Sequence, residues 1–172
     1  MRLSPVIDRR ADWARRCQLT ANLLEYPFYE GKGVMAETSL IKKLAIKSGY
    51  KLLVLNAPDG YLQQLGPLPE GAELSTNGAG PFDFVQMFAY SKADVDSMAD
   101  AAINALKPGG LLWFAYPKKS SKIKTDITRD IGWDTVLKTG FETVSAIAID
   151  DTWSALRFKP HQDIKARAAR DI

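Results

Sequence analysis

Short apolar runs divide the central part of the chain into segments of strand length. Residues 51–56, 82–89 and 111–116 are mostly apolar and too short to be buried helices. Runs of this kind, bounded by turn residues, are typical of parallel strands that are buried on both faces. The sequence therefore predicts three central strands.

Weaker strand patterns surround these three. Residues 72–75 form a brief run between two turns rich in glycine and proline. Residues 141–149 and 152–158 are two β-rich runs separated by Asp150-Asp151. Two such runs joined by a tight turn predict an antiparallel hairpin.

Helical spacing fills the segments between the strands. Ser91 with Asp94 three residues later is a capping box, and apolar residues between 95 and 106 then recur every three or four positions. This pattern predicts a helix with one buried face. Three further helices are expected at residues 39–49, 58–65 and 129–139.

The alternation of strand and helix predicts an α/β fold. We expect a single doubly wound, mostly parallel, Rossmann-like sheet that ends in an antiparallel hairpin, with helices on both faces. Residues 36–159 would form this domain, with an N-terminal arm at 1–35 and a polar, helical C-terminal tail at 160–172. The clustered arginines of the arm are interpreted as a solvated helix face or as a contact for an acidic partner.

Composition narrows the classes of function. The chain has 172 residues, of which 46% are hydrophobic and 25% charged, and a net charge of +3. This charge is too small to favour general nucleic-acid binding. Cys17 and His161 are the single residues of their types, which argues against a disulfide, a zinc site or a Cys/His mechanism. We find no membrane-spanning or signal segment, and we expect a cytoplasmic protein.

Two motifs resemble those of a known family. Phe82-Asp83-Phe84-Val85 and Leu106-Lys107-Pro108-Gly109-Gly110 are similar to a strand and a turn in the latter half of class I S-adenosylmethionine-dependent methyltransferases. The resemblance covers residues 38–159 and implies a methyltransferase-like fold. More closely, Leu55-Asn56-Ala57-Pro58 and 151–158 resemble an uncharacterised bacterial family, a domain of unknown function with a degenerate form of this layout. That likeness implies a fold and no established reaction.

The loop after the first strand departs from the enzymes of that family. Residues 56–61 have the sequence Asn-Ala-Pro-Asp-Gly-Tyr, with Cβ atoms where spaced glycines would let a cofactor approach the main chain. The second strand ends in Ser75-Thr76-Asn77 instead of an acidic residue. We therefore expect the standard cofactor pocket to be lost and no cofactor to be bound. S-adenosylmethionine is expected only if the pocket has been rebuilt.

The strand ends nominate a ligand site. In open parallel sheets, ligands bind beyond the carboxyl ends of the strands where the strand order reverses. The candidate ligand-binding residues at this edge are Asn56, Asp59, Tyr61, Tyr90, Ser91, Tyr116, Lys118, Lys119 and Asp126. No residue is assigned a catalytic role.

Several of these residues have alternative structural roles. The loop at 117–124 carries four lysines that could hold a phosphate or carboxylate, or could simply be a solvated loop. Asp126 could cap a helix, and Asp59 could begin a turn or helix.

Three functions follow from these patterns. The leading interpretation is a non-catalytic methyltransferase-like domain that binds a small anionic ligand or a protein partner. The alternative is a divergent S-adenosylmethionine-dependent methyltransferase with a pocket rebuilt from Asn56, Asp59 and Tyr61. The third is an interaction protein that forms a homodimer through its aromatic arm.

Overall fold

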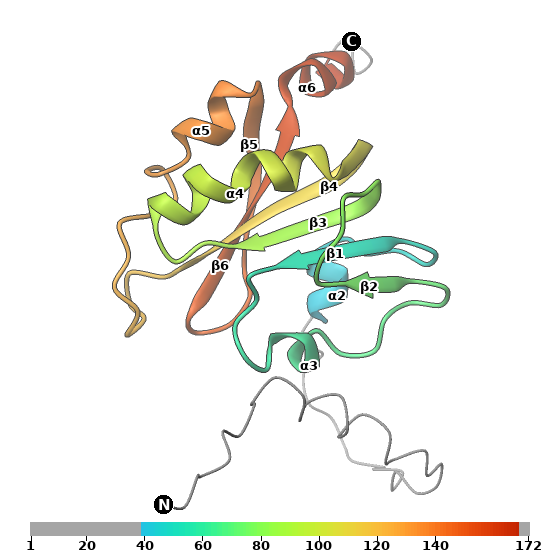
Figure 1. The fold of residues 1–172 in the computed structure, drawn as a ribbon, viewed down its shortest axis with the longest axis horizontal. Helices are drawn as coiled ribbons and strands as arrows, with labels where there is room; N and C mark the ends of the chain where they lie inside the picture. Colours follow the sequence, from blue (N-terminus) through green and yellow to red (C-terminus); the bar gives the residue numbers. More distant parts are fainter. Residues whose placement is uncertain (1–38, 169–172) are drawn as a thin grey trace, which may run out of the picture. The chain divides into compact units, whose positions relative to one another are not determined.

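The protein is described here by a computed structural model covering residues 39–168. The expected N-terminal arm at 1–35 lies outside the described residues. Figure 1 shows how the elements are arranged. In chain order they are α2 (Leu40–Lys43), β1 (Lys51–Leu55), α3 (Tyr61–Leu65), β2 (Glu73–Ser75), β3 (Phe82–Phe88), α4 (Lys92–Asn104), β4 (Leu106–Pro117), α5 (Asp134–Lys138), β5 (Phe141–Ala148), β6 (Trp153–Pro160) and α6 (His161–Ala168).

The six strands form one sheet in the order β2-β1-β3-β4-β6-β5. The pairs among β2, β1, β3 and β4 are parallel, whereas β6 is antiparallel to both β4 and β5. The chain runs from β1 outward to β2 and then returns to β3 on the other side of β1. The strand order therefore reverses between β1 and β3, and the predicted mostly parallel sheet with a terminal hairpin is confirmed.

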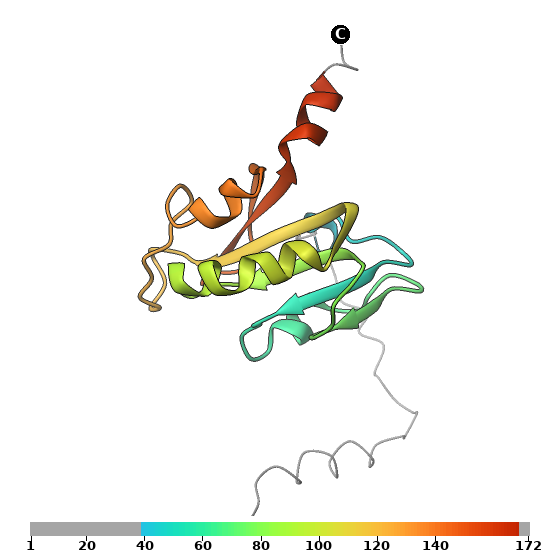
Figure 2. The same cartoon turned by 45° about the horizontal axis from the view of Figure 1, so that its top comes forward.

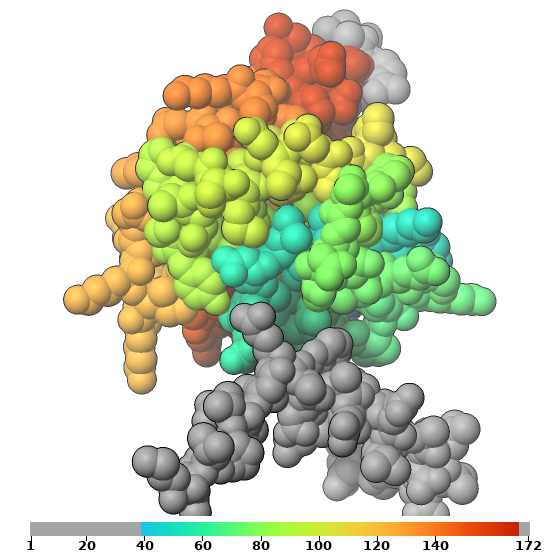
Figure 3. All heavy atoms as spheres, viewed as in Figure 1, coloured from blue at the N-terminus to red at the C-terminus, as the bar shows by residue number. Residues whose placement is uncertain are grey.

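Apolar side chains cover both faces of the sheet. One face packs against Val95, Ala99 and Ala102 of α4 and Val136 of α5. The opposite face packs against a second cluster that includes Leu44, just after α2, and Tyr61 and Leu65 of α3. Figure 3 shows the first face, with α4 in lime and yellow across its middle. Because each face has its own buried layer, the domain is doubly wound as predicted.

Two predicted helices are much shorter than their sequence patterns suggest. The helix expected at 39–49 spans only Leu40–Lys43, since Ala45 adopts a left-handed backbone with φ of 61°. The helix expected at 129–139 begins only at Asp134, because Gly132 has φ of 103° and Thr128 closes a turn with Ile131. Left-handed residues interrupt the run of helical dihedral angles that a helix requires. Both predicted lengths are therefore wrong, although a helix is present in each segment.

The third short helix, α3, begins three residues later than expected. Pro58 precedes it, and its carbonyl accepts a hydrogen bond from Tyr61 N at 3.1 Å. Gly60, with φ of 83°, occupies the N-cap position. The segment 56–60 is therefore a loop at the carboxyl end of β1.

The Pro108-Gly109-Gly110 turn lies inside β4 instead of separating α4 from a later strand. Strand β4 begins at Leu106, which pairs with Phe82, and the register then shifts before Leu111 pairs with Phe84. A Cβ atom on Gly110 would lie 2.9 Å from Lys107 O, so only glycine fits at this irregularity. The segment that resembles the methyltransferase turn is therefore a bulge near the start of β4.

The described part of the C-terminal tail is helical as predicted, and α6 follows β6 directly. Figure 2 shows α6, in dark red, extending away from the sheet. None of the helices in residues 39–168 is both long enough and apolar enough to cross a membrane.

Candidate functional site

Asn56 joins the two strands at which the sheet order reverses. It follows β1 directly and has a left-handed backbone with φ of 54°. Its Nδ2 donates a hydrogen bond of 2.9 Å to the carbonyl of Phe88, the last residue of β3. Asparagine tolerates this backbone region better than most residues. The side chain therefore fixes the start of the loop at the carboxyl edge of the sheet.

The loop after β1 has two residues with a left-handed backbone, although only one of the two is a glycine. Asn56 supplies the first, and Gly60, with φ of 83°, supplies the second. A Cβ atom on Gly60 would meet no atom within 4 Å, so the main chain there borders open space. Glycine-rich ligand loops provide the same two features, a left-handed turn and an approachable main chain.

A cavity of about 300 Å³ lies beside this loop. It exists because β2 has three residues and pairs only with Lys51–Leu53 of β1, so the later part of β1 has no strand beside it on that side. Its lining residues are Val54, Asn56, Ala57, Pro58, Asp59, Gly60, Leu62, Gln63 and Thr76. The lining combines polar side chains with the apolar side chains of Val54, Ala57, Pro58 and Leu62.

Tyr90 lies on the β3 side of the same edge. Its ring makes an edge contact with Trp153, with centroids 5.0 Å apart. Burial raises the pKa of Tyr90 above its usual value, and the carboxylates of Asp59 and Asp94 raise it further. The hydroxyl is therefore neutral at physiological pH. The negative charge of Asp59 acts on it across the switch point, which is the place between β1 and β3 where the strand order reverses.

Three of the predicted site residues have structural roles at this edge. The Tyr61 side chain is 1% exposed, and its hydroxyl donates to Gln86 Oε1 at 2.6 Å within the core. Ser91 is the N-cap of α4, where its hydroxyl accepts from Asp94 N. Asp126 accepts from Lys92 N at 2.7 Å, so it also caps α4. The alternative that Asp126 caps a helix therefore agrees with the geometry, although the helix is α4 and not the one that follows it.

The lysine loop lies apart from the cavity. Lys118 Nζ donates to Asp150 O at 2.5 Å, and Lys118 N donates to Thr152 O at 2.8 Å, which ties the loop to the hairpin turn. Lys119 is exposed, and Tyr116 is buried against the ring of Trp133. In Figure 3 the loop after β4, in light orange, stands out from the body of the domain. Among the predicted site residues, the structure therefore gathers Asn56, Asp59 and Tyr90 around the switch point.

Gln63 and Thr76 line the cavity but were not among the predicted site residues. Thr76 follows β2, and the sequence already marked this strand end as the place where methyltransferases carry an acidic residue. Gln63 lies on the exposed side of α3, and a five-residue helix gives too little periodicity to reveal which side faces a cavity.

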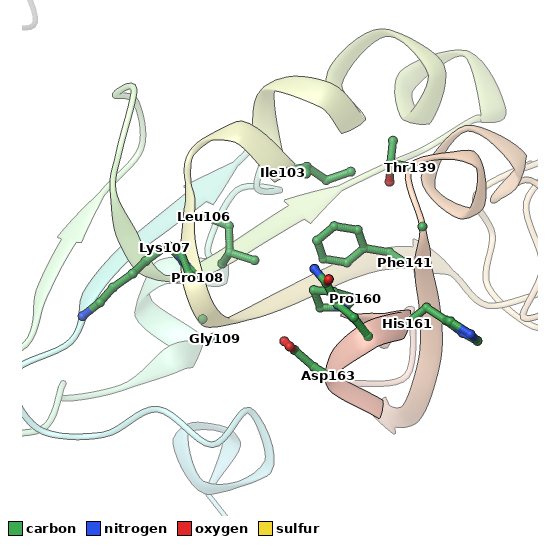
Figure 4. Close-up of a pocket in the computed structure, with 13 residues that line it drawn as sticks. Ile103, Leu106, Lys107, Pro108, Gly109, Thr139, Phe141, Pro160, His161 and Asp163 are labelled. Carbon is green, nitrogen blue, oxygen red and sulfur yellow. The ribbon is translucent and has the colours of Figure 1, made fainter. Parts of the chain in front are cut away.

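A cavity larger than the one beside the β1 loop is at the opposite end of the sheet. Its volume is about 580 Å³, and Figure 4 shows Phe141 and Leu106 facing it, with His161 and Asp163 near its rim. It lies where β4 begins, away from the carboxyl ends of the parallel strands. His161 Nδ1 contacts Glu142 Oε1 there. Volume alone does not make this cavity the ligand site, because the strand-order rule selects the other edge.

The sheet topology defines a Rossmann-like fold of the methyltransferase-like kind. A solved structure described as the DhpI–SAH complex aligns with a TM-score of 0.50 and 13% identity, over 71% of this chain and 82% of that chain. A SAM-dependent methyltransferase from Aquifex aeolicus aligns at 0.49 with 12% identity, over 69% and 86%. Fibrillarin from Aeropyrum pernix with natively bound S-adenosyl-L-methionine aligns at 0.46 with 14% identity, over 66% and 67%.

Sequence comparison adds no family to this likeness. No family model matches the chain, and no curated protein matches it. The expected methyltransferase-like fold is therefore confirmed, whereas the closer resemblance to an uncharacterised bacterial family has no support beyond the fold.

The expectation that no cofactor is bound has to be corrected. A solved structure that shares the fold, the DhpI–SAH complex, contains SAH. The absence of spaced glycines suggested that the pocket was lost. In the structure, Asn56 and Gly60 supply the left-handed positions and a cavity remains beside them. The loop sequence is therefore no argument against such a cofactor.

Proposed function

We propose that the protein is a divergent S-adenosylmethionine-dependent methyltransferase that binds its cofactor in the cavity beside the β1 loop. The observation that carries the proposal is the position of this cavity. It lies at the carboxyl end of β1, next to the switch point, and is bordered by a loop with two left-handed residues. Open α/β sheets bind nucleotide-like ligands at this place.

The polar lining of the cavity suits a nucleoside. Asp59 offers a carboxylate, Thr76 a hydroxyl and Gln63 an amide, and these groups can bond to ribose hydroxyls or to a purine edge. Ala57, Pro58 and Leu62 provide apolar surface for a base. The cofactor, when bound, supplies an electrophilic methyl group on a positively charged sulfur. Asp59 is the one carboxylate of the lining, so it is the residue expected to favour that charge.

The leading interpretation from the sequence, anion binding by the lysine loop without catalysis, has less support. It depends on Lys118 and Lys119 acting together. The Lys118 ammonium already donates to Asp150 O, and the loop does not line the cavity. Because the Lys118 ammonium is held by the hairpin turn, it contributes less to binding an anion in the loop.

Thermal unfolding with S-adenosylhomocysteine tests the proposal. If the dissociation constant is about 10 μM, about 1 mM of this ligand should raise the midpoint by roughly 5–10 °C. Thr76→Val should reduce the shift, because it removes a hydroxyl from the lining. Thr143→Val, on the exposed side of β5, is the matched control and should leave the shift unchanged. A midpoint that does not move at this concentration would contradict the proposal.

A further inference from the structure

A third cavity lies on the terminal hairpin, between β5, β6 and α6. Its volume is about 380 Å³, and its lining includes the basic residues Arg157, Lys159 and Arg167. Asp163 is the one carboxylate of the lining, and Ser145 adds a hydroxyl. The cavity therefore gathers three cations against one anion, although the whole chain carries only a small positive charge.

Arg157 is unusual for a cation in the interior of a strand. It lies on β6 between Trp113 of β4 and Ser145 of β5, on the face of the sheet that also carries the core residues Trp153 and Ala155. Its side chain is half-buried, and its Nε is inaccessible to solvent and has no hydrogen-bond partner within residues 39–168. Leaving a buried donor of a charged group without a partner costs free energy, which an acceptor in the cavity would recover.

The electrostatics around Arg157 point in the same direction. Burial lowers the pKa of its guanidinium below the usual value, the charge of Arg167 lowers it further, and only Tyr50 acts in the opposite direction. A half-buried cation therefore lies within the influence of a like charge. An anion beside Arg157 would offset the cost of burying its charge.

We propose that this cavity binds a phosphate group. Three basic side chains with a neighbouring hydroxyl match a doubly charged anion with several acceptor oxygens better than they match a single carboxylate. The phosphate could belong to a small phosphorylated compound or to a nucleic-acid backbone. The cavity is on the hairpin and shares no lining residue with the cavity beside the β1 loop, so the inference does not depend on the proposed cofactor site.

Calorimetric titration of the full chain with inorganic phosphate tests the proposal. Arg157→Met keeps the apolar stem and removes the charge, and it should weaken phosphate binding by about tenfold or more. Lys159→Met should weaken it by a smaller factor. Lys165→Met, on α6 and outside the lining, is the matched control and should bind as the wild type does. Circular dichroism melting of each variant checks that the domain is folded.

A parallel titration with a short single-stranded RNA distinguishes the two sources. RNA binding that inorganic phosphate displaces and Arg157→Met weakens would identify a backbone phosphate. Phosphate binding without RNA binding would identify a small compound, and both results support the site. The proposal would be overturned if the wild type showed no saturable phosphate binding. It would also be overturned if Lys165→Met weakened the binding as much as Arg157→Met and Lys159→Met do.

Discussion

At the scale of single residues, Asn56 is the side chain that holds the two central strand ends together. Its amide bonds to Phe88 O, and its backbone is left-handed. Asn56→Ala should lower the free energy of unfolding by about 1–3 kcal/mol. It removes the hydrogen bond, and alanine tolerates a positive φ less well than asparagine does. Asn56→Gly loses the same bond but accepts the backbone, so it should cost less. Urea denaturation of both variants measures the difference, and equal losses would show that the backbone conformation contributes nothing.

Tyr61 makes stability depend on alkaline pH. Burial raises its pKa above 10.0, its hydrogen bond to Gln86 opposes this, and Asp150 adds to the increase. Because the folded state favours the neutral phenol, the contribution is fully present below about pH 10 and declines as the pH rises from there towards the folded-state pKa. The wild type should therefore lose more stability than Tyr61→Phe between about pH 9 and about pH 11. Urea denaturation across this range would contradict the account if both proteins lost the same amount.

At the scale of elements, the start of α4 is held by three side chains. Ser91 and Asp94 form a reciprocal capping box, and Asp126 accepts from Lys92 N. Ser91→Ala should lower the free energy of unfolding by about 1 kcal/mol, because one N-terminal donor loses its acceptor. Ser97→Ala is the control, since Ser97 is exposed and only donates to Asp94 O. If the two variants unfold at the same urea concentration, the cap contributes no stability.

The strands and the long helix α4 could be predicted from the sequence, whereas the lengths of the short helices could not. The helix α4 and the strands β1, β3 and β6 agree with their predicted ranges within a few residues. Burial of one face repeats every three or four residues in α4, whereas β1 and β3 are buried on both faces and are continuous apolar runs. The helix α2 ends early before the left-handed Ala45, and α5 begins late because Gly132, with a positive φ, precedes it. Nothing local marks Ala45, since alanine favours helices, and tertiary packing decides its conformation.

At the scale of the whole molecule, the strand order decides which of the predicted site residues lie near one another. Topology alone brings the residues that follow β1 and β3 to one edge, and the structure gathers Asn56, Asp59 and Tyr90 there. The cavity could not be predicted, because it depends on how far β2 extends along β1. Tyr61 could not be assigned to the core, because its hydroxyl partner Gln86 lies 25 residues away in sequence, on β3.

The central claim is that the cavity beside the β1 loop binds S-adenosylmethionine, and calorimetric titration of the full chain with this compound tests it most directly. We expect saturable binding with a micromolar dissociation constant. Asp59→Asn should weaken it by about tenfold, because a charged partner of the ligand is lost. Asp100→Asn, which removes an exposed carboxylate on α4, should bind as the wild type does. No saturable heat up to about 1 mM, where even weak sites show binding, would contradict the claim.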